Sequence, residues 1–210
     1  MLYEVQNLQL SYDQPLFETV SFQIRAGECL AISGANGSGK SSLLKYLTKQ
    51  FQGTYEVEYE QETAMKISYI QQYFNYEGSL QQLVDEKKLV LEEVIHKLRI
   101  LGLSREKLTQ NVQDLSYGEQ QKVALALSLS EEADVYILDE PLTYLDLYNQ
   151  EQVLKLLQTV KPTLVLVDHH FSLYSASKST NSRTQTALKL NKANKKSLPL
   201  FGKLFCCAKA

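Results

Sequence analysis

One short segment constrains the fold of this chain more than any other. Residues 34–41 fit the pattern G-x-x-x-x-G-K-[ST] at every constrained position. The flanking sequence suits a loop of this kind, because an apolar run at residues 29–32 reads as a buried strand and residues 42–47 read as a helix. The sequence therefore predicts an α/β fold in which a strand, this phosphate-binding loop (P-loop) and a helix follow one another.

The residue types in the P-loop suit a nucleoside triphosphate with its magnesium ion. Glycines let the backbone curl so that successive N–H groups point at phosphate oxygens. Lys40 adds a positive charge for the β- and γ-phosphates, and the Ser41 hydroxyl can ligate Mg²⁺. The start of the helix also favours anions. The predicted nucleotide-binding residues are Gly34, Ala35, Asn36, Gly37, Ser38, Gly39, Lys40, Ser41 and Ser42.

Two adjacent carboxylates follow a second apolar run. Residues 135–138 are apolar and lead into Asp139 and Glu140. Runs of this kind are central strands of parallel sheets, and ligands bind beyond the carboxyl ends of such strands. We expect Asp139 to hold Mg²⁺, directly or through water, and Glu140 to polarise a water molecule against the γ-phosphate.

A third segment, L-S-Y-G-E-Q-Q at residues 115–121, predicts the start of a helix. Ser116 and Glu119 have the spacing of a capping box, and an apolar stretch follows at residues 123–127. Taken alone, this pattern indicates only a helix N-terminus.

Together, the P-loop, the Asp139-Glu140 pair and residues 115–121 resemble the motifs of ATP-binding-cassette (ABC) ATPases. In that family the third segment, the signature, binds the γ-phosphate of a nucleotide held by another domain. The resemblance assigns this role to Ser116, Gly118 and Glu119. Tyr117 departs from the family pattern, which usually has glycine at this position.

The resemblance also assigns two residues to the γ-phosphate and the metal. Gln72 matches the glutamine that ligates Mg²⁺ and couples the core to the helical arm, with Gln71 as a close rival. His169, at the end of an apolar run at residues 163–167, matches the switch histidine that contacts the γ-phosphate, and His170 is its adjacent alternative.

Two further residues complete the expected site. Tyr12 lies upstream of the P-loop and resembles the aromatic residue that stacks on adenine, although a core or surface tyrosine is the alternative in a chain with thirteen tyrosines. Asp146 resembles part of the loop that crosses the dimer interface.

The resemblance covers residues 1–171 and implies a mainly parallel core sheet, an antiparallel β part and a small helical arm at about residues 78–115. Strand-like alternation at residues 54–59 and 66–70 and helical spacing at residues 91–101 agree with this division.

Composition indicates a soluble protein of the cytoplasm. The apolar fraction is 44%, and no run approaches the roughly eighteen apolar residues that would cross a bilayer. Three cysteines give no disulfide framework, and no signal peptide is visible.

The basic residues are unevenly distributed. After Asp168 there are eight Lys and Arg residues and no acidic one, so the rest of the chain keeps 14 basic against 24 acidic residues, a net charge of −10. Residues 172–210 are therefore expected to form a basic tail. It fits a disordered extension, an RNA-binding arm, or a membrane-surface contact through residues 198–201 and 206–207. It also fits an aberrant ending, and a short strand at residues 186–190 would complete the sheet.

The resemblance implies that this chain cannot close an ATP site alone, because it has one P-loop and one signature. A second cassette is therefore expected, either as a homodimer or on another chain. The short interval between Lys40 and Ser116 and the segment at residues 139–152 look most like the second cassette of ABC-F proteins, which act on the ribosome and include antibiotic-resistance factors. The alternative is the ATP-binding subunit of an ABC transporter, beside a separate membrane permease.

Overall fold

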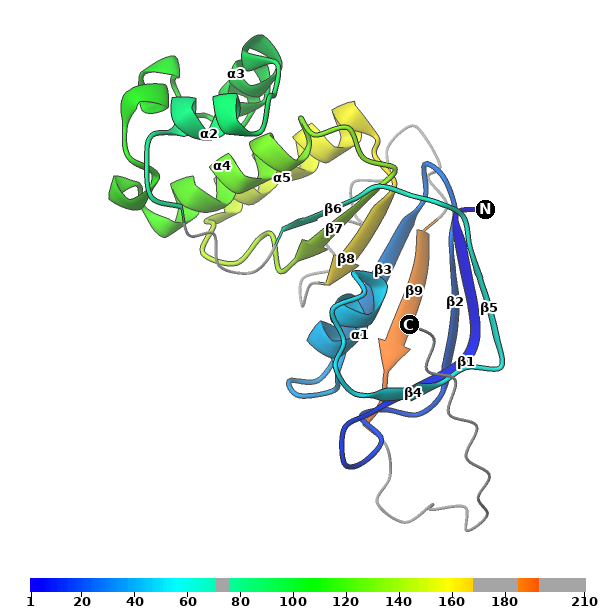
Figure 1. Cartoon of the computed structure of the whole chain (residues 1–210). Coiled ribbons are helices and arrows are strands. Elements are labelled where there is room, and N and C mark those ends of the chain that lie inside the picture. The colour runs from blue at the N-terminus through cyan, green and yellow to red at the C-terminus, as the bar shows by residue number, and fades with distance from the viewer. Residues whose placement is uncertain (71–75, 168–184, 193–210) are drawn as a thin grey trace.

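A computed structural model describes residues 1–70, 76–167 and 185–192 of the chain. Its centre is a five-stranded sheet in the order β6-β7-β8-β3-β9, in which every pair of neighbours is parallel (Figure 1). These strands are β3 (Cys29–Gly34), β6 (Ile67–Ile70), β7 (Val135–Asp139), β8 (Leu164–Val167) and β9 (Gln185–Leu190).

A second, antiparallel sheet forms around one long strand. β1 pairs with β2 along one edge, and with β5 and then β4 along the other. The strands are β1 (Tyr3–Ser11), β2 (Val20–Ile24), β4 (Thr54–Glu56) and β5 (Tyr59–Glu62). This confirms the predicted combination of a parallel core with an antiparallel β part.

The helices divide between the two faces of the parallel sheet. In β7, Val135 and Ile137 face the cluster that contains helix α1 (Lys40–Leu47) and the antiparallel sheet. Tyr136 and Leu138 face the other cluster, which contains α4 (Tyr117–Ser128) and α5 (Leu147–Val160). The period of two is that of a strand buried on both faces, as predicted for this run.

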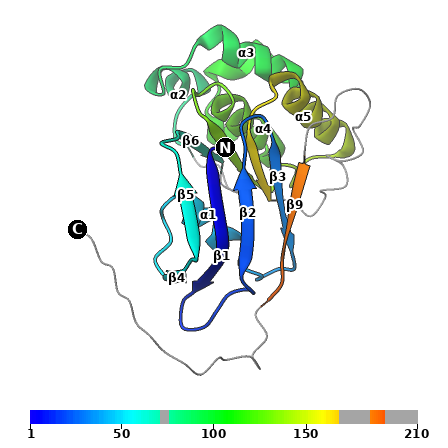
Figure 2. The same cartoon turned by 90° about the vertical axis from the view of Figure 1, so that its right-hand side faces the viewer.

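The helical arm lies beside α4 and α5 (Figures 1 and 2). It contains α2 (Leu80–Glu86), α3 (Leu91–Ile100) and two short 3₁₀ helices, η1 (Arg105–Thr109) and η2 (Val112–Asp114). Its apolar side chains, among them Leu80, Val94 and Leu98, join the same core cluster as α4. Within the part of the chain that the structure describes, no helix has the length and apolar character needed to cross a membrane.

Strand β9 shows that the sheet continues beyond the boundary expected at residue 171. It pairs in parallel with β3 from Cys29 opposite Gln185 to Gly34 opposite Leu190. The short strand expected at residues 186–190 is thus present, and this segment is part of the sheet rather than a free tail. The domain boundary at residue 171 and the basic tail at residues 172–210 stay predictions.

Candidate nucleotide-binding site

The P-loop connects β3 to α1 in the predicted order, with the helix beginning at Lys40, two residues earlier than expected. Gly37 and Gly39 have φ angles of 71° and 93°, a left-handed region that side chains with a Cβ rarely adopt. A Cβ at Gly39 would also lie 2.6 Å from Cδ1 of Phe17, a fully buried residue. The loop conformation therefore requires glycine at these positions.

The polar groups of the loop suit a phosphate ligand. The Lys40 ammonium donates to the carbonyl oxygens of Gly34 and Ala35, at 2.9 and 3.2 Å, and its side chain is only 9% exposed. The Ser38 hydroxyl is buried and has no hydrogen-bond partner among the residues that the structure describes. Ala35, Asn36 and Gly37 lie exposed at the tip of the loop. A curled, glycine-dependent loop at a helix N-terminus, with a cation and an unsatisfied hydroxyl, fits a phosphate chain.

The carboxyl end of β7 places Asp139 near the P-loop. Asp139 is 9% exposed, and burial, followed by the adjacent charge of Glu140, raises the pKa of its carboxyl group to about 6. The charge of Lys40 and a hydrogen bond from the Tyr69 hydroxyl act in the opposite direction. Asp139 and Lys40 are therefore close enough to interact electrostatically, as a shared phosphate-metal site requires. Oxygen donors such as Asp139 and the exposed Ser41 are the ligands that Mg²⁺ prefers.

Glu140 begins a tight turn directly after β7. Its φ is 50°, its N–H donates to the carbonyl of Val167 in β8 at 2.8 Å, and Thr143 Oγ1 donates to its Oε2 at 3.4 Å. A non-glycine residue in this left-handed region is held there by its surroundings, and such strain is often found at functional sites. Backbone and side chain are thus both fixed at the edge of the sheet where the P-loop lies.

Sequence reasoning missed two partners of these carboxylates, Tyr69 and Thr143. Burial, followed by the charge of Asp139, raises the pKa of the Tyr69 hydroxyl to about 12. Tyr69 lies on β6 opposite Ile137 of β7, so only the pairing of these strands brings it to Asp139. Thr143 is three residues after Glu140, and a turn signal in this segment would have indicated its contact.

The signature forms the predicted capping box at the start of α4. Ser116 Oγ accepts a hydrogen bond from the Glu119 N–H at 3.3 Å, and the Ser116 N–H donates to Glu119 Oε2 at 3.0 Å. Lys107 of η1 pairs with Glu119 at 2.9 Å. The Lys107 hydrogen bond, followed by that of the Ser116 backbone, lowers the pKa of Glu119 to about 2. The Glu119 carboxylate therefore makes its contacts within this domain, where it connects the start of α4 to η1 of the helical arm.

The loop that contains Asp146 packs directly against the signature. A Cβ at Gly118 would lie 3.2 Å from the carbonyl oxygen of Tyr144 and 3.4 Å from Leu145 Cδ2. Asp146 caps α5, accepting a hydrogen bond from the Asn149 N–H at 2.8 Å. Gly118 and Asp146 thus belong to one continuous surface formed by two helix starts.

The signature and the P-loop are built on different layers of the fold. α4 packs on one face of the parallel sheet and α1 on the other (Figure 1). Tyr12 follows β1, is 49% exposed, and its ring lies 5.1 Å from that of Phe51. Gln72 and His169, together with their alternatives Gln71 and His170, lie outside the described residues.

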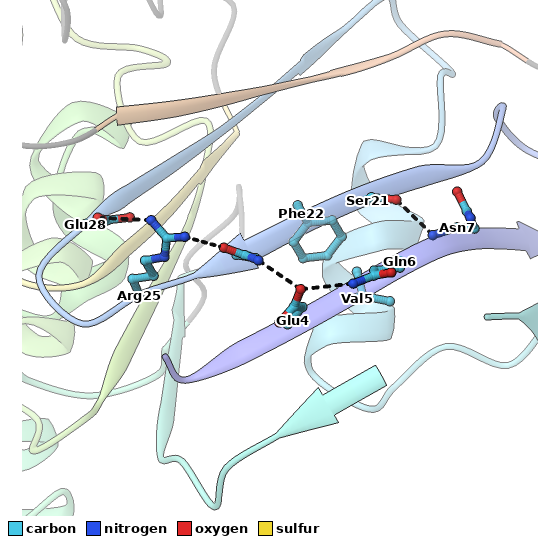
Figure 3. Close-up of a pocket in the computed structure, with 9 residues that line it drawn as sticks. Glu4, Val5, Gln6, Asn7, Ser21, Phe22, Arg25 and Glu28 are labelled. Carbon is cyan, nitrogen blue, oxygen red and sulfur yellow. Dashed lines mark hydrogen bonds and ion pairs between the residues drawn. The ribbon is translucent and has the colours of Figure 1, made fainter. Parts of the chain in front are cut away.

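A separate concavity lies on the antiparallel sheet. It has a volume of about 480 Å³ and is lined by residues of β1 and β2 and the segment that follows, including Glu4, Gln23, Arg25 and Glu28 (Figure 3). Gln23 donates to Glu4 at 2.9 Å, and Arg25 donates to Gln23 at 2.6 Å and pairs with Glu28 at 4.0 Å. Because these polar groups bond to one another, we assign the nucleotide to the P-loop instead.

The fold and the loops define a P-loop nucleotide-binding domain. The sequence profile of the family described as "ABC transporter" matches residues 17–143. The chain therefore belongs to the ABC family, whose members are ATPases, as the resemblance of its motifs implied.

Relatives within the family have different functions. The chain is 34% identical over 185 residues to the ribosome protection protein VmlR of Bacillus subtilis, covering 86% of this chain and 33% of that protein. It is 31% identical over 173 residues to the zinc import ATP-binding protein ZnuC 1 of Hahella chejuensis, covering 77% of this chain and 66% of that protein. A solved ATP-binding subunit of an ABC transporter has a TM-score of 0.72 at 22% identity, covering 90% of this chain and 86% of that one. This last likeness supports the fold alone. The chain spans about a third of the length of VmlR.

Proposed function

We propose that this chain binds and hydrolyses Mg-ATP as one half of a nucleotide-switched pair of cassettes, and that the pair acts on the ribosome in the manner of ABC-F proteins. The observation that carries the ATPase part is the glycine-dependent P-loop, with the Lys40 ammonium bonded to its carbonyl oxygens, on the same parallel sheet whose strand β7 ends at Asp139.

The residues of the proposed site have two kinds of role, binding the nucleotide with its metal ion and activating water. Lys40 would exchange its bonds to the loop carbonyls for phosphate oxygens, and Glu140 would orient the attacking water. Mg²⁺, held by Ser41 and Asp139 with Gln72 as a further ligand, would neutralise charge on the phosphates. His169 would contact the γ-phosphate, and Tyr12 would stack on adenine. The roles of Gln72, His169 and Tyr12 rest on the family motifs, and those of Lys40, Ser41, Asp139 and Glu140 are also supported by the positions of these residues around the P-loop and the end of β7.

A second cassette is proposed because α4, which begins at the signature, and α1, which begins at the P-loop, pack on opposite faces of the parallel sheet. The Ser116–Gly118 segment would then complete the ATP site of a partner, with Asp146 at the interface. ATP would hold the two cassettes together, and hydrolysis would release them. The partner is another copy of this chain or a cassette on another chain.

The ribosome is favoured as the site of action by the likeness to VmlR and by the short interval between Lys40 and Ser116. We place the protein in the cytoplasm, in association with the ribosome. The alternative is supported by the likeness to ZnuC 1. In that case the chain would energise a separate permease at the inner face of the membrane.

Co-sedimentation of the Glu140→Gln protein with purified ribosomes, with and without ATP, tests the choice. This variant should keep ATP binding and lose turnover about 100-fold or more, because the water is no longer activated. Pelleting that depends on ATP would support the ribosomal role. A protein that binds ATP and stays in the supernatant would favour the transporter role.

Two controls make the result specific. Lys40→Ala should not pellet with ATP, because it lacks the phosphate-binding cation. Glu151→Gln, on the exposed side of α5, should hydrolyse ATP like the original protein. Normal turnover in Glu140→Gln would contradict the role of Glu140.

A further inference from the structure

Strand β9 ends beside the start of the P-loop. β3 and β9 stay in register up to Gly34 opposite Leu190, so both strands reach the first residue of the loop together. The carbonyl oxygen of Leu190 lies 2.8 Å from the position that a Cβ would take at Gly34. The residues that follow Leu190 are therefore at the level of the phosphate-binding loop.

The next two residues are held in place by backbone contacts. Asn191 accepts a hydrogen bond from the Glu18 N–H at 3.1 Å, and Lys192 forms an antiparallel bridge with Phe17. Phe17 is fully buried and also packs against Gly39 of the P-loop. Lys192 is thus bridged through its backbone to Phe17, the residue that packs against Gly39 at the end of the P-loop.

The side chain of Lys192 extends over the tip of the P-loop. Its Nζ and Cε atoms lie 3.7 and 3.9 Å from the position of a Cβ at Gly37. Gly37 is exposed, and so is Lys192. None of the ion pairs within the described parts of the chain involves Lys192.

A second ammonium beside this loop has an evident chemical use. A polyphosphate carries several negative charges, and Lys40 is a single buried cation already bonded to loop carbonyls. A flexible, exposed lysine can approach from the solvent side and act as a point charge on the same anion.

We propose that Lys192 is a second cationic ligand for the phosphates of the nucleotide bound by the P-loop. The inference rests on the proposed ATP binding and adds a residue that lies outside the family match at residues 17–143. It also assigns a role to Lys192, one of the lysines of the basic C-terminal region.

The test is a charge series at residue 192 in the full chain, with Mg-ATP titrated calorimetrically. Lys192→Arg should bind within about twofold of the original protein. Lys192→Gln should bind up to about fivefold more weakly, the upper end of the range for an exposed charge pair, and Lys192→Glu more weakly still. The differences should shrink at high salt, since exposed charges are screened. Lys155→Gln, at an exposed position of α5, is the matched control and should bind normally.

The outcomes separate this inference from the proposed function. If the original protein binds Mg-ATP and Lys192→Glu binds it equally well, Lys192 is not a ligand and the inference is wrong. If Lys192→Arg loses as much affinity as Lys192→Gln, or if Tm falls along with affinity, the role is structural and the inference is also wrong. If the original protein itself binds no Mg-ATP, the proposed function is wrong, and this inference is then wrong as well.

Discussion

The rings of Tyr117 and Tyr144 lie 5.7 Å apart at an interplanar angle of 33°, and they join the start of the signature helix to the loop before α5. Both are exposed, at 69% and 53%. Leu147 and Tyr148, the first two residues of α5, are exposed as well. Exposed aromatic and apolar side chains therefore lie beside the signature. One of them, Tyr117, is the residue that replaces the glycine usual in the family.

We predict that Tyr117→Ala weakens nucleotide-dependent pairing of cassettes. In the paired state we expect the exposed Tyr117 ring to contact the partner cassette, and an aromatic contact contributes about 0.5–1.5 kcal/mol beyond the burial of its surface, so the pairing constant should fall about two- to tenfold. The measurement is analytical ultracentrifugation of the Glu140→Gln protein with ATP, with and without Tyr117→Ala. Tyr59→Ala, at an exposed position of β5, should leave the pairing unchanged. Equal pairing without the Tyr117 ring would contradict the prediction, and stronger pairing would show that the ring hinders the approach of the partner.

Lys40→Ala should lower the affinity for ATP about 10- to 100-fold, the range for losing a hydrogen bond to a charged group. Calorimetric titration with ATP measures the effect directly. Lys45→Ala is the control, because Lys45 is an exposed lysine on the same helix. An unchanged affinity in Lys40→Ala would place the nucleotide elsewhere on the molecule.

The sequence predicted those parts of the site whose function depends on local pattern. The P-loop glycines, the Asp139-Glu140 pair and the Ser116–Glu119 capping box each combine a motif with the element that contains it, so their placement follows from a few neighbouring residues.

Contacts between distant segments were not predictable in this way. Tyr69 meets Asp139 only because β6 pairs with β7, and Phe17 meets Gly39 only because the antiparallel sheet packs over α1. Lys192 reaches Gly37 because β9 is in register with β3. A single sequence holds no local signal for such pairings, and a lysine in a basic segment looks like any other exposed charge.

The ion pair between Lys107 and Glu119 should make the stability of the domain depend on acid pH. The pKa of Glu119 is lowered to about 2 in the folded protein, so its carboxylate contributes stability above about pH 4.5 that is lost as the pH falls toward 2. Glu119→Gln keeps a capping-box residue but removes the charge. At pH 7 we expect Tm to fall by about 1–4 °C, as for a partly exposed pair of about 0.5–1 kcal/mol. Thermal melts should show this difference shrinking below pH 4, and a difference independent of pH would contradict the ion-pair explanation.

Asp139 should have the opposite effect on stability. Burial raises the pKa of its carboxyl group to about 6, above its ordinary 3.8, so the nucleotide-free fold binds this proton more tightly than the unfolded chain does. The free energy of unfolding therefore decreases as the pH rises from about 4 to 6, and the full penalty is present at pH 8.

Asp139→Asn removes this charge and should raise the Tm of the nucleotide-free protein at pH 8 by a few degrees, since 1 kcal/mol corresponds to about 2–4 °C in a chain of this size. The gain should vanish near pH 4, where the aspartate is protonated in the folded protein. ATP turnover should be lost at the same time, because the proposed metal ligand is gone. Melting curves at the two pH values, with turnover assays on the same samples, measure both effects. A variant that melts lower at pH 8 would show that contacts of the Asp139 carboxylate, such as that with Tyr69, outweigh the cost of burying its charge.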